Sequence, residues 1–207
     1  MKETLLKGLA ELKLDLSDQQ VEQLLAYLAL LVKWNKAYNL TAIREPDKML
    51  THHLLDSMAI APYIAGNHIL DVGSGAGLPG IPMAITYPEK QFTLLDSNGK
   101  KTRFIQQAII DLGLPNADVV QSRVEEWKPE HKYEGIISRA FSSISDFING
   151  CSMHLAEGGT FYAMKGQFPN DEMALLPTGF KLEEQLSLHV PFLIGERHLL
   201  KIINTSE

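Results

Sequence analysis

The sequence predicts an α/β fold in which helices cover both faces of a mostly parallel, seven-stranded sheet, preceded by an N-terminal helical extension. Apolar residues before Gly66 recur only at helical spacings. After Gly66, short apolar runs rich in branched residues alternate with helical stretches, which is typical of parallel strands buried on both faces. We therefore expect a helical extension over residues 1–66 and one compact domain over residues 67–207.

Two helices are expected in the extension. Residues 16–38 carry apolar side chains at spacings of three and four, and Ser17 with Gln20 forms a capping box at the start. The second helix is expected over residues 46–61, because its proline suits a first helical turn and a proline and a glycine follow it.

Strands and helices alternate through most of the second part. The five apolar runs that we expect to form parallel strands are residues 69–72, 92–95, 118–120, 135–137 and 160–164. One intervening helix ends at Gly113, and another is expected over residues 145–156. The runs 182–190 and 198–203 have no helix between them, so they should form an antiparallel pair at the sheet edge.

Charge and cysteine content narrow the class of protein. The 25 acidic residues outnumber the 19 basic ones, giving a net charge of −6, which argues against a general nucleic-acid coat protein. The single cysteine, Cys151, excludes an intramolecular disulfide and a cysteine-based zinc cluster. No secretion signal is visible, and the longest apolar run, residues 24–32, is too short to span a bilayer. We expect a soluble, cytoplasmic protein.

A glycine-rich loop follows the first expected strand. Gly75, Gly77 and Gly80 match the spacing G-x-G-x-x-G, with Asp96 about twenty residues further on, as in a dinucleotide site. Glycines let a ligand approach the backbone closely, although they could serve only a tight strand-to-helix turn. Asp96, at the end of the second strand, could likewise be a helix N-cap.

Electrostatics favours a cationic ligand at this loop. Asp71 is expected to end its strand with the carboxylate pointing at the ligand space, and residues 49–89 contain no Lys or Arg. A pyrophosphate there would be repelled by roughly 3 to 4 kcal/mol per charge pair. S-adenosylmethionine carries a sulfonium and an ammonium, and Asp96 is placed to accept from its ribose hydroxyls. We therefore expect this cofactor, bound by Asp71, Gly75, Gly77 and Asp96.

Several segments resemble known methyltransferases. The glycine loop, Asp96, the HLAEGG turn at residues 154–159 and the final strand pair resemble class I, Rossmann-like methyltransferases. Five segments are similar to the RsmG (GidB) family: KWNKAYNLT at 33–41, HLLDS at 53–57, GLPGIP at 77–82, SRVEE at 122–126 and ISRAF at 137–141. The resemblance spans nearly the whole chain. It implies methylation of N7 of guanine 527 in bacterial 16S ribosomal RNA.

The resemblance also assigns cofactor contacts. It implies that the backbone at Gly73 and Leu78 meets the methionine and ribose, that Val124 packs on the adenine with Glu125 beside it, and that Arg139 contacts the cofactor. The Arg139 guanidinium could pair with the methionine carboxylate or with an RNA phosphate. Its structural alternative is a salt bridge to an acidic residue, Asp71 or Glu125.

Basic and polar residues are candidates for RNA contact. The cluster Lys100, Lys101 and Arg103 lies at an expected helix start, although such a cluster is often only a solvated face. Lys165, Asn39 and His53 complete the candidate RNA-binding residues, and Trp34 and Tyr38 could stack on flipped bases or simply pack on the domain.

The reaction itself needs no general acid or base. Guanine N7 carries a lone pair and no proton, so alignment with the sulfonium methyl should dominate, and we name no catalytic residue. His52 and His53 with Asp56 invite a metal site, but adjacent histidines on a helix point about 100° apart and a third ligand is missing, so no metal is expected. Cys151 is expected to be a small buried residue.

The expected partner is 16S rRNA in the small ribosomal subunit or its precursor, bound by a monomer with few phosphate contacts. Two other functions stay open. The same fold could use a nicotinamide dinucleotide in an oxidoreductase, or the chain could be a ribosome-binding or regulatory module with an inactive site.

Overall fold

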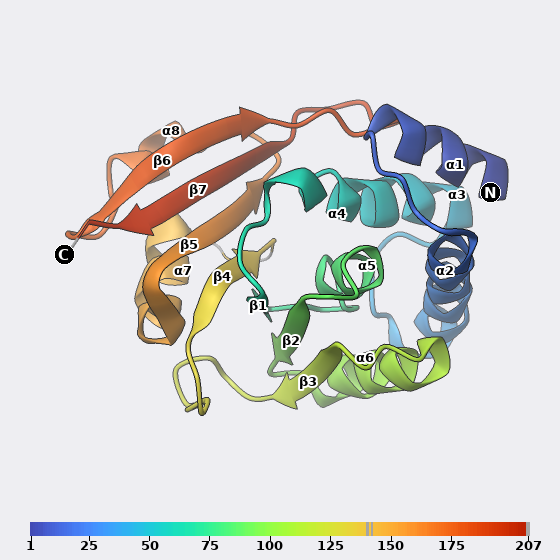
Figure 1. Cartoon of the computed structure of the whole chain (residues 1–207), viewed down its shortest axis with the longest axis horizontal. Coiled ribbons are helices and arrows are strands. Elements are labelled where there is room, and N and C mark those ends of the chain that lie inside the picture. The colour runs from blue at the N-terminus through green and yellow to red at the C-terminus, as the bar shows by residue number, and fades with distance from the viewer. Residues whose placement is uncertain (140, 142, 206–207) are drawn as a thin grey trace.

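Within residues 1–139, 141 and 143–205, which are those that the computed structural model describes, one seven-stranded sheet forms the centre of the molecule (Figure 1). Its strands lie in the order β3-β2-β1-β4-β5-β7-β6. The strands are β1 (His68–Val72), β2 (Gln91–Asp96), β3 (Ala117–Gln121), β4 (Tyr133–Ser138), β5 (Leu155–Lys165), β6 (Phe180–Ser187) and β7 (His198–Asn204). The predicted fold class is confirmed.

Strand β7 runs against its two neighbours in the sheet. The pairs formed by β1 to β5 are parallel, whereas β7 runs antiparallel to both β5 and β6. The expected antiparallel pair therefore lies at the sheet edge. The order of the parallel strands reverses between β1 and β4, and in such sheets ligands bind in the crevice outside the carboxyl ends of the strands near this point.

The N-terminal segment is helical, as predicted, but more finely divided. Its elements are α1 (Lys2–Glu11), α2 (Asp18–Tyr38), α3 (Pro46–Met49), the π-helical η1 (Leu50–Leu55), α4 (Asp56–Met58) and η2 (Ala61–Tyr63). The capping box is present, because the Gln20 N–H donates to Ser17 Oγ and the Ser17 N–H donates to Gln20 Oε1. Neither α1 nor the π-helical turn within the second expected helix was predicted.

The remaining helices cover both faces of the sheet. They are α5 (Gly80–Thr86), α6 (Gly99–Leu112), α7 (Ile144–Cys151), η3 (Ser152–His154) and α8 (Asn170–Met173). α7 lies on one side of the sheet, and α4, α5 and α6 lie on the other (Figure 1). α6 ends at Gly113 in the left-handed conformation, with φ of 60°, as its position predicted.

The prediction of one helix over residues 145–156 is wrong at its end. α7 stops at Cys151, and β5 begins at Leu155, which pairs with Tyr133 of β4. The register of β4 and β5 shifts immediately afterwards, and Gly158, with φ of 70°, lies in that irregular part of the strand. Gly158 therefore belongs to a bulge in β5 and does not end a helix.

Two hydrophobic cores lie on the two faces of the sheet. Ile69 of β1 packs in the core that also holds Leu28 of α2 and Phe104 of α6, whereas its neighbour Leu70 packs in the core of Phe147 on α7. The helical extension thus shares a core with the sheet, and the division at residue 66 stays a prediction. No helix in the described part of the chain is long and apolar enough to cross a membrane.

Cys151 belongs to the core beneath α7 and is fully buried. Burial raises the pKa of its thiol to about 12, so the thiolate needed for nucleophilic attack is not available near neutral pH. The expectation of a small buried residue is confirmed.

Candidate functional site

The carboxylate of Asp71 lies underneath the glycine loop. Its Oδ2 accepts a hydrogen bond of 2.8 Å from the N–H of Gly80, the first residue of α5, and only 1% of the residue is exposed. Burial raises the pKa of this carboxyl to about 7. The expectation that it points at the ligand space is therefore wrong, because the first N–H groups of a helix need acceptors and Asp71 supplies one.

Five backbone N–H groups of the loop donate to acceptors in β2 and in the loop itself. Dinucleotide sites hold a pyrophosphate with free loop N–H groups and with a helix N-terminus, and here a carboxylate already occupies the start of α5. This geometry argues against a dinucleotide. Gly73 and Ser74 donate to the Leu95 carbonyl, Gly75 donates to Asp96 Oδ2, and Gly77 and Leu78 donate to the Ser74 carbonyl, over 2.8 to 3.1 Å.

A first cavity of about 340 Å³ opens at the carboxyl ends of β1, β2 and β3. This volume lies at the small end of the range for ligand pockets, roughly 300 to 1,000 Å³. Four residues predicted to bind the cofactor line it, namely Gly73, Asp96, Val124 and Glu125. Gly75, Gly77 and Leu78 belong to the loop beside the cavity but are not part of its wall.

Asp96 joins the glycine loop to the wall of the first cavity. Its Oδ2 accepts from the Gly75 N–H and its Oδ1 from the Asn98 N–H, each at 2.8 Å. The helix N-cap at this point is Asn98, whose side chain accepts from the N–H of Lys100, so the N-cap alternative for Asp96 is wrong. Asp96 therefore stands at the end of β2 as a largely buried acceptor that faces the cavity.

The charge of the first cavity is balanced. Lys101 and Arg123 line it together with Asp96 and Glu125, and Lys101 Nζ lies 3.8 Å from Asp96 Oδ2. Residues 49–89 contain no Lys or Arg, but α6 and the segment after β3 contribute Lys101 and Arg123 to the cavity. Attraction of a cation is thus weaker than expected, and the internally bonded loop is the stronger argument against a pyrophosphate.

A buried histidine holds the segment after β3 in place. The ring of His154 donates from Nε2 to the Val124 carbonyl at 2.9 Å and stacks on Trp127, with ring centroids 5.6 Å apart. Only 1% of His154 is exposed. The contact links η3 to the wall of the first cavity, although the His154 side chain is not among the residues that line the cavity.

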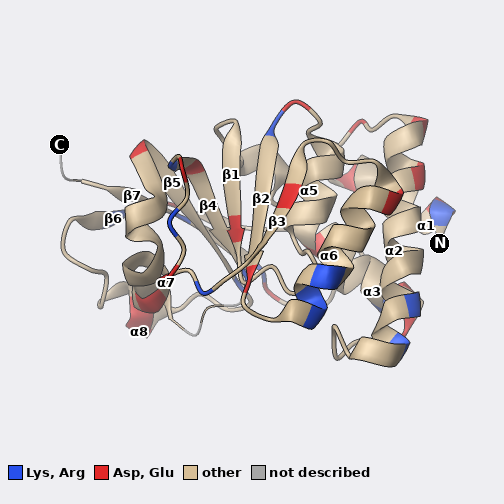
Figure 2. Ribbon diagram, turned by 90° about the horizontal axis from the view of Figure 1, so that it is seen from below, with Lys and Arg blue, Asp and Glu red and all other residues tan. Residues whose placement is uncertain are grey.

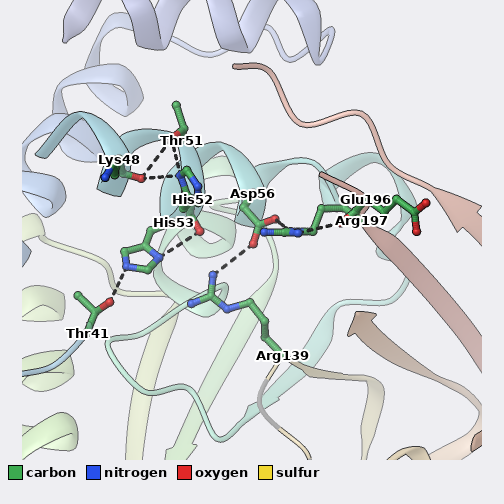
Figure 3. A network of polar contacts seen from close by, with 9 residues as sticks. All are labelled: Thr41, Lys48, Thr51, His52, His53, Asp56, Arg139, Glu196 and Arg197. Carbon is green, nitrogen blue, oxygen red and sulfur yellow. Dashed lines mark hydrogen bonds and ion pairs between the residues drawn. The ribbon is translucent and has the colours of Figure 1, made fainter. Parts of the chain in front are cut away.

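A second cavity, of about 320 Å³, is lined by residues at the end of β5 and at the start of β7. Arg139, which follows β4, lines this cavity and not the first. Its Nη1 lies 3.4 Å from Asp56 Oδ2, and Arg197 Nε lies 2.7 Å from Asp56 Oδ1 (Figure 3). Arg139 thus forms a salt bridge, but with Asp56 and not with either acid that was expected. Ala140, the next residue of the ISRAF segment, lies outside the described residues.

His53 also reaches the second cavity, as a neutral ring. Burial lowers its pKa to about 4. Its Nε2 lies 2.8 Å from Thr41 Oγ1, and its Nδ1 lies 3.1 Å from the His52 carbonyl (Figure 3). Among the residues that the structure describes, no three His, Cys, Asp or Glu side chains gather as metal ligands would.

The residues predicted to bind RNA are not brought together in one patch. Lys100 and Arg103 are exposed on the first turns of α6, which lies on the same side of the molecule as basic residues of α2 (Figure 2). Lys165 lines the second cavity, but its charge is paired with Glu172 at 2.9 Å. Asn39 ends α2 in the left-handed conformation and accepts from Arg44 at 3.0 Å.

Trp34 and Tyr38 stack on each other, with ring centroids 5.2 Å apart, and Trp34 also packs against Phe104 of α6. The packing alternative for Trp34 is therefore correct. Tyr38 stays 41% exposed.

Arg197 and His198 are lining residues that sequence reasoning missed. Both belong to the second cavity; His198 is the first residue of β7, and Arg197 directly precedes it. No local pattern marks them, because their distance in sequence from Arg139 and Asp56 is closed only by the antiparallel return of β7 against β5.

Comparison with known proteins identifies the family. A family model described as rRNA small subunit methyltransferase G (GidB) matches residues 20–200. The chain belongs to this family. The chain is 56% identical over 201 residues to ribosomal RNA small subunit methyltransferase G of Ectopseudomonas mendocina, covering 96% of this chain and 94% of that protein. The protein of that name from Pseudomonas aeruginosa is 55% identical, covering 98% and 95%. The resemblance to the RsmG family is thereby confirmed.

Solved structures show the same fold at low identity. A ribosomal protein L11 methylase from Lactobacillus delbrueckii subsp. bulgaricus has a TM-score of 0.57 at 18% identity, covering 73% of this chain and 77% of that chain. A tRNA (uracil-54, C5)-methyltransferase of Pyrococcus abyssi, in complex with S-adenosyl-L-homocysteine, has a TM-score of 0.54 at 15% identity, covering 71% and 37%. The fold is therefore that of the Rossmann-like methyltransferases.

Asp71→Asn is expected to change how stability depends on pH. The folded-state pKa of about 7 lies above the value of about 3.9 for an unfolded chain, so between these values the folded protein holds a proton that the unfolded chain has released. The stability contributed by this group is therefore full at low pH and falls by about 1.4 kcal/mol per pH unit as pH rises through the window. Urea unfolding at about pH 5, 6 and 7 should show the variant losing less stability than the wild type.

The matched control is Asp111→Asn, which changes an exposed carboxylate on α6 and should leave the pH profile unchanged. If the free energy of unfolding depended on pH in the same way for Asp71→Asn and the wild type, Asp71 would ionise in the folded state as it does in the unfolded chain.

Proposed function

We propose that this chain transfers the methyl group of S-adenosylmethionine to N7 of guanine 527 in 16S ribosomal RNA. The observation that carries the proposal is the gathering of Gly73, Asp96, Val124 and Glu125 around one cavity at the carboxyl ends of parallel strands. The relatives that share more than half of the sequence are named ribosomal RNA small subunit methyltransferase G, which supports an rRNA substrate.

The first cavity fits the adenosine part of this cofactor. Asp96 offers a buried carboxylate for the two ribose hydroxyls, and Val124 offers an apolar surface for the adenine face. Gly75 adopts φ of 61°, and a Cβ atom there would lie 3.9 Å from its nearest neighbour, so the space above the loop is open. The bound cofactor would supply an electrophilic methyl group on its sulfonium.

The residues of this chain act by alignment. Guanine N7 attacks with its own lone pair, so no side chain has to remove a proton, and holding the two reactants at near-attack distance supplies the rate. We assign Gly73, Leu78 and Arg139 to the methionine end of the cofactor, and Asp71 and Gly77 to the shape of the loop that carries it.

The proposed setting is the cytoplasm, where a monomer acts on 16S rRNA in the small ribosomal subunit or its precursor. Exposed Lys100 and Arg103 would contact phosphates, with Lys101 reaching toward the cofactor cavity. Because Lys165 is paired with Glu172, it adds little free charge for the RNA. Binding should therefore depend on few phosphates and fall only gently with rising salt.

Asp96→Asn should weaken cofactor binding about 10- to 100-fold, because the amide replaces a charged acceptor of hydrogen bonds to the ribose and to the loop. Calorimetric titration with S-adenosylmethionine measures the change. Asp111→Asn, on the exposed face of α6, is the matched control and should bind like the wild type. Equal affinity in Asp96→Asn would remove Asp96 from the site.

Labelled S-adenosylmethionine offered with naked 16S rRNA and with small subunits that lack the modification tests the whole reaction. We expect label on the RNA, and strand cleavage specific for N7-methylguanine should map it to guanine 527. Label on protein, or on an exocyclic nitrogen of a base, would refute the proposed reaction. The ratio of the two rates identifies the true substrate.

A further inference from the structure

The second cavity is bordered by parts of the chain that are far apart in sequence. The π-helical η1, the segment after β4, the end of β5 and the start of β7 all reach it. His198 of β7 pairs directly with Lys165 of β5 in the antiparallel register, so the two side chains share one face of the sheet. Residues that directly oppose each other in this way can act on a single ligand.

Hydrogen-bond donors outnumber acceptors in this cavity. Among the described residues that line the cavity, only Asp56 is acidic, and its nearly buried carboxylate already contacts Arg139 Nη1 and Arg197 Nε. Arg197 donates a further bond, from Nη1 to the Glu196 carbonyl at 2.7 Å (Figure 3). Each guanidinium has five N–H groups, so both retain donors beyond the contacts made among the described residues.

Among the described residues, His198 is a buried polar side chain whose ring has no hydrogen-bond partner. The residue is 8% exposed and lines the cavity, and neither ring nitrogen is hydrogen-bonded among the described residues. The nearest carboxylate oxygen is Glu196 Oε2, which lies 3.5 Å from His198 Nε2 and belongs to a largely exposed side chain. Phe168 packs edge-on against the imidazole ring, with the two ring centroids 6.1 Å apart. Buried polar groups are nearly always paired, so an unpaired one that faces a cavity points to a ligand that completes it.

We propose that the second cavity receives the methyl-accepting guanine as a flipped-out base, and that Arg197 and His198 recognise its edge. The proposal rests on the function proposed above. The acceptor must lie next to the first cavity, and the short segment after β4 joins the two, because Arg139 lines the second cavity and Phe141 lines the first. Ile43, Met164 and Leu188 supply apolar surface for the faces of the base, as pockets for flipped bases do.

The donors of this cavity also distinguish guanine from adenine. Beside N7, guanine presents the acceptor O6, whereas adenine presents an amino group that is itself a donor. The Arg197 guanidinium and an imidazole N–H of His198 pair with O6 and leave the N7 lone pair free to attack. An adenine in the same position would place its amino group against these donors, with the one carboxylate already engaged. The cavity is thus selective for guanine.

His198→Leu tests the proposal, with His189→Leu as the matched control on an exposed histidine outside the cavity. Leucine removes the unpaired ring nitrogens, so thermal stability should stay equal or rise, and calorimetric affinity for S-adenosylmethionine should not change. With saturating cofactor and unmodified small subunits, kcat/KM for N7 methylation should fall at least about tenfold. His198→Gln, which restores a polar group, should recover part of the loss.

Unchanged kcat/KM in His198→Leu, in an assay where the wild type methylates N7, would overturn the assignment of the second cavity while leaving the proposed function intact. A loss of affinity for S-adenosylmethionine in the same variant would place His198 in the cofactor site and would also overturn the assignment of the second cavity. If the wild type itself places no methyl group on N7 of guanine, the proposed function fails, and the inference fails with it.

Discussion

The contact between the Asp71 carboxylate and the Gly80 N–H sets the shape on which the first cavity depends. It joins the end of β1 to the start of α5 and closes the glycine loop from below. No larger residue fits at Gly80, because a Cβ atom there would lie 2.6 Å from the Leu94 side chain and 2.8 Å from Asp71 Oδ2. Burial disfavours the ionised form of this carboxyl and raises its pKa to about 7. The loop thus carries its own carboxyl group where a dinucleotide site would bind a phosphate.

The fold was predictable because its signals are local. Apolar runs, the capping box at Ser17 and the glycine after α6 each act within a few residues, and the missing helix before residue 198 was enough to predict an antiparallel edge. The direction of the Asp71 side chain was not predictable, because its partner Gly80 becomes a neighbour only when the loop has folded.

The candidate site was predictable in one half only. The residues of the first cavity follow the ends of consecutive parallel strands, and this regularity allowed Asp96 to be placed from the sequence, whereas the resemblance to the RsmG family supplied Val124. The residues of the second cavity do not follow this regularity of strand ends. It depends on where η1 packs and on the return of β7, so Arg197 and His198 carry no signal that a reader of the sequence could use.

One buried carboxylate couples the helical extension to the rest of the molecule. Asp56 of α4 holds guanidinium groups from the segment after β4 and from the start of β7, so three separate parts of the chain meet at a single side chain. Loss of either arginine would leave the buried Asp56 carboxylate with less compensation for its charge. The extension therefore cannot move independently of the sheet at this point. Cofactor binding can rest on the strand ends alone, whereas selection of the base requires the extension, because the walls of the second cavity are built from both.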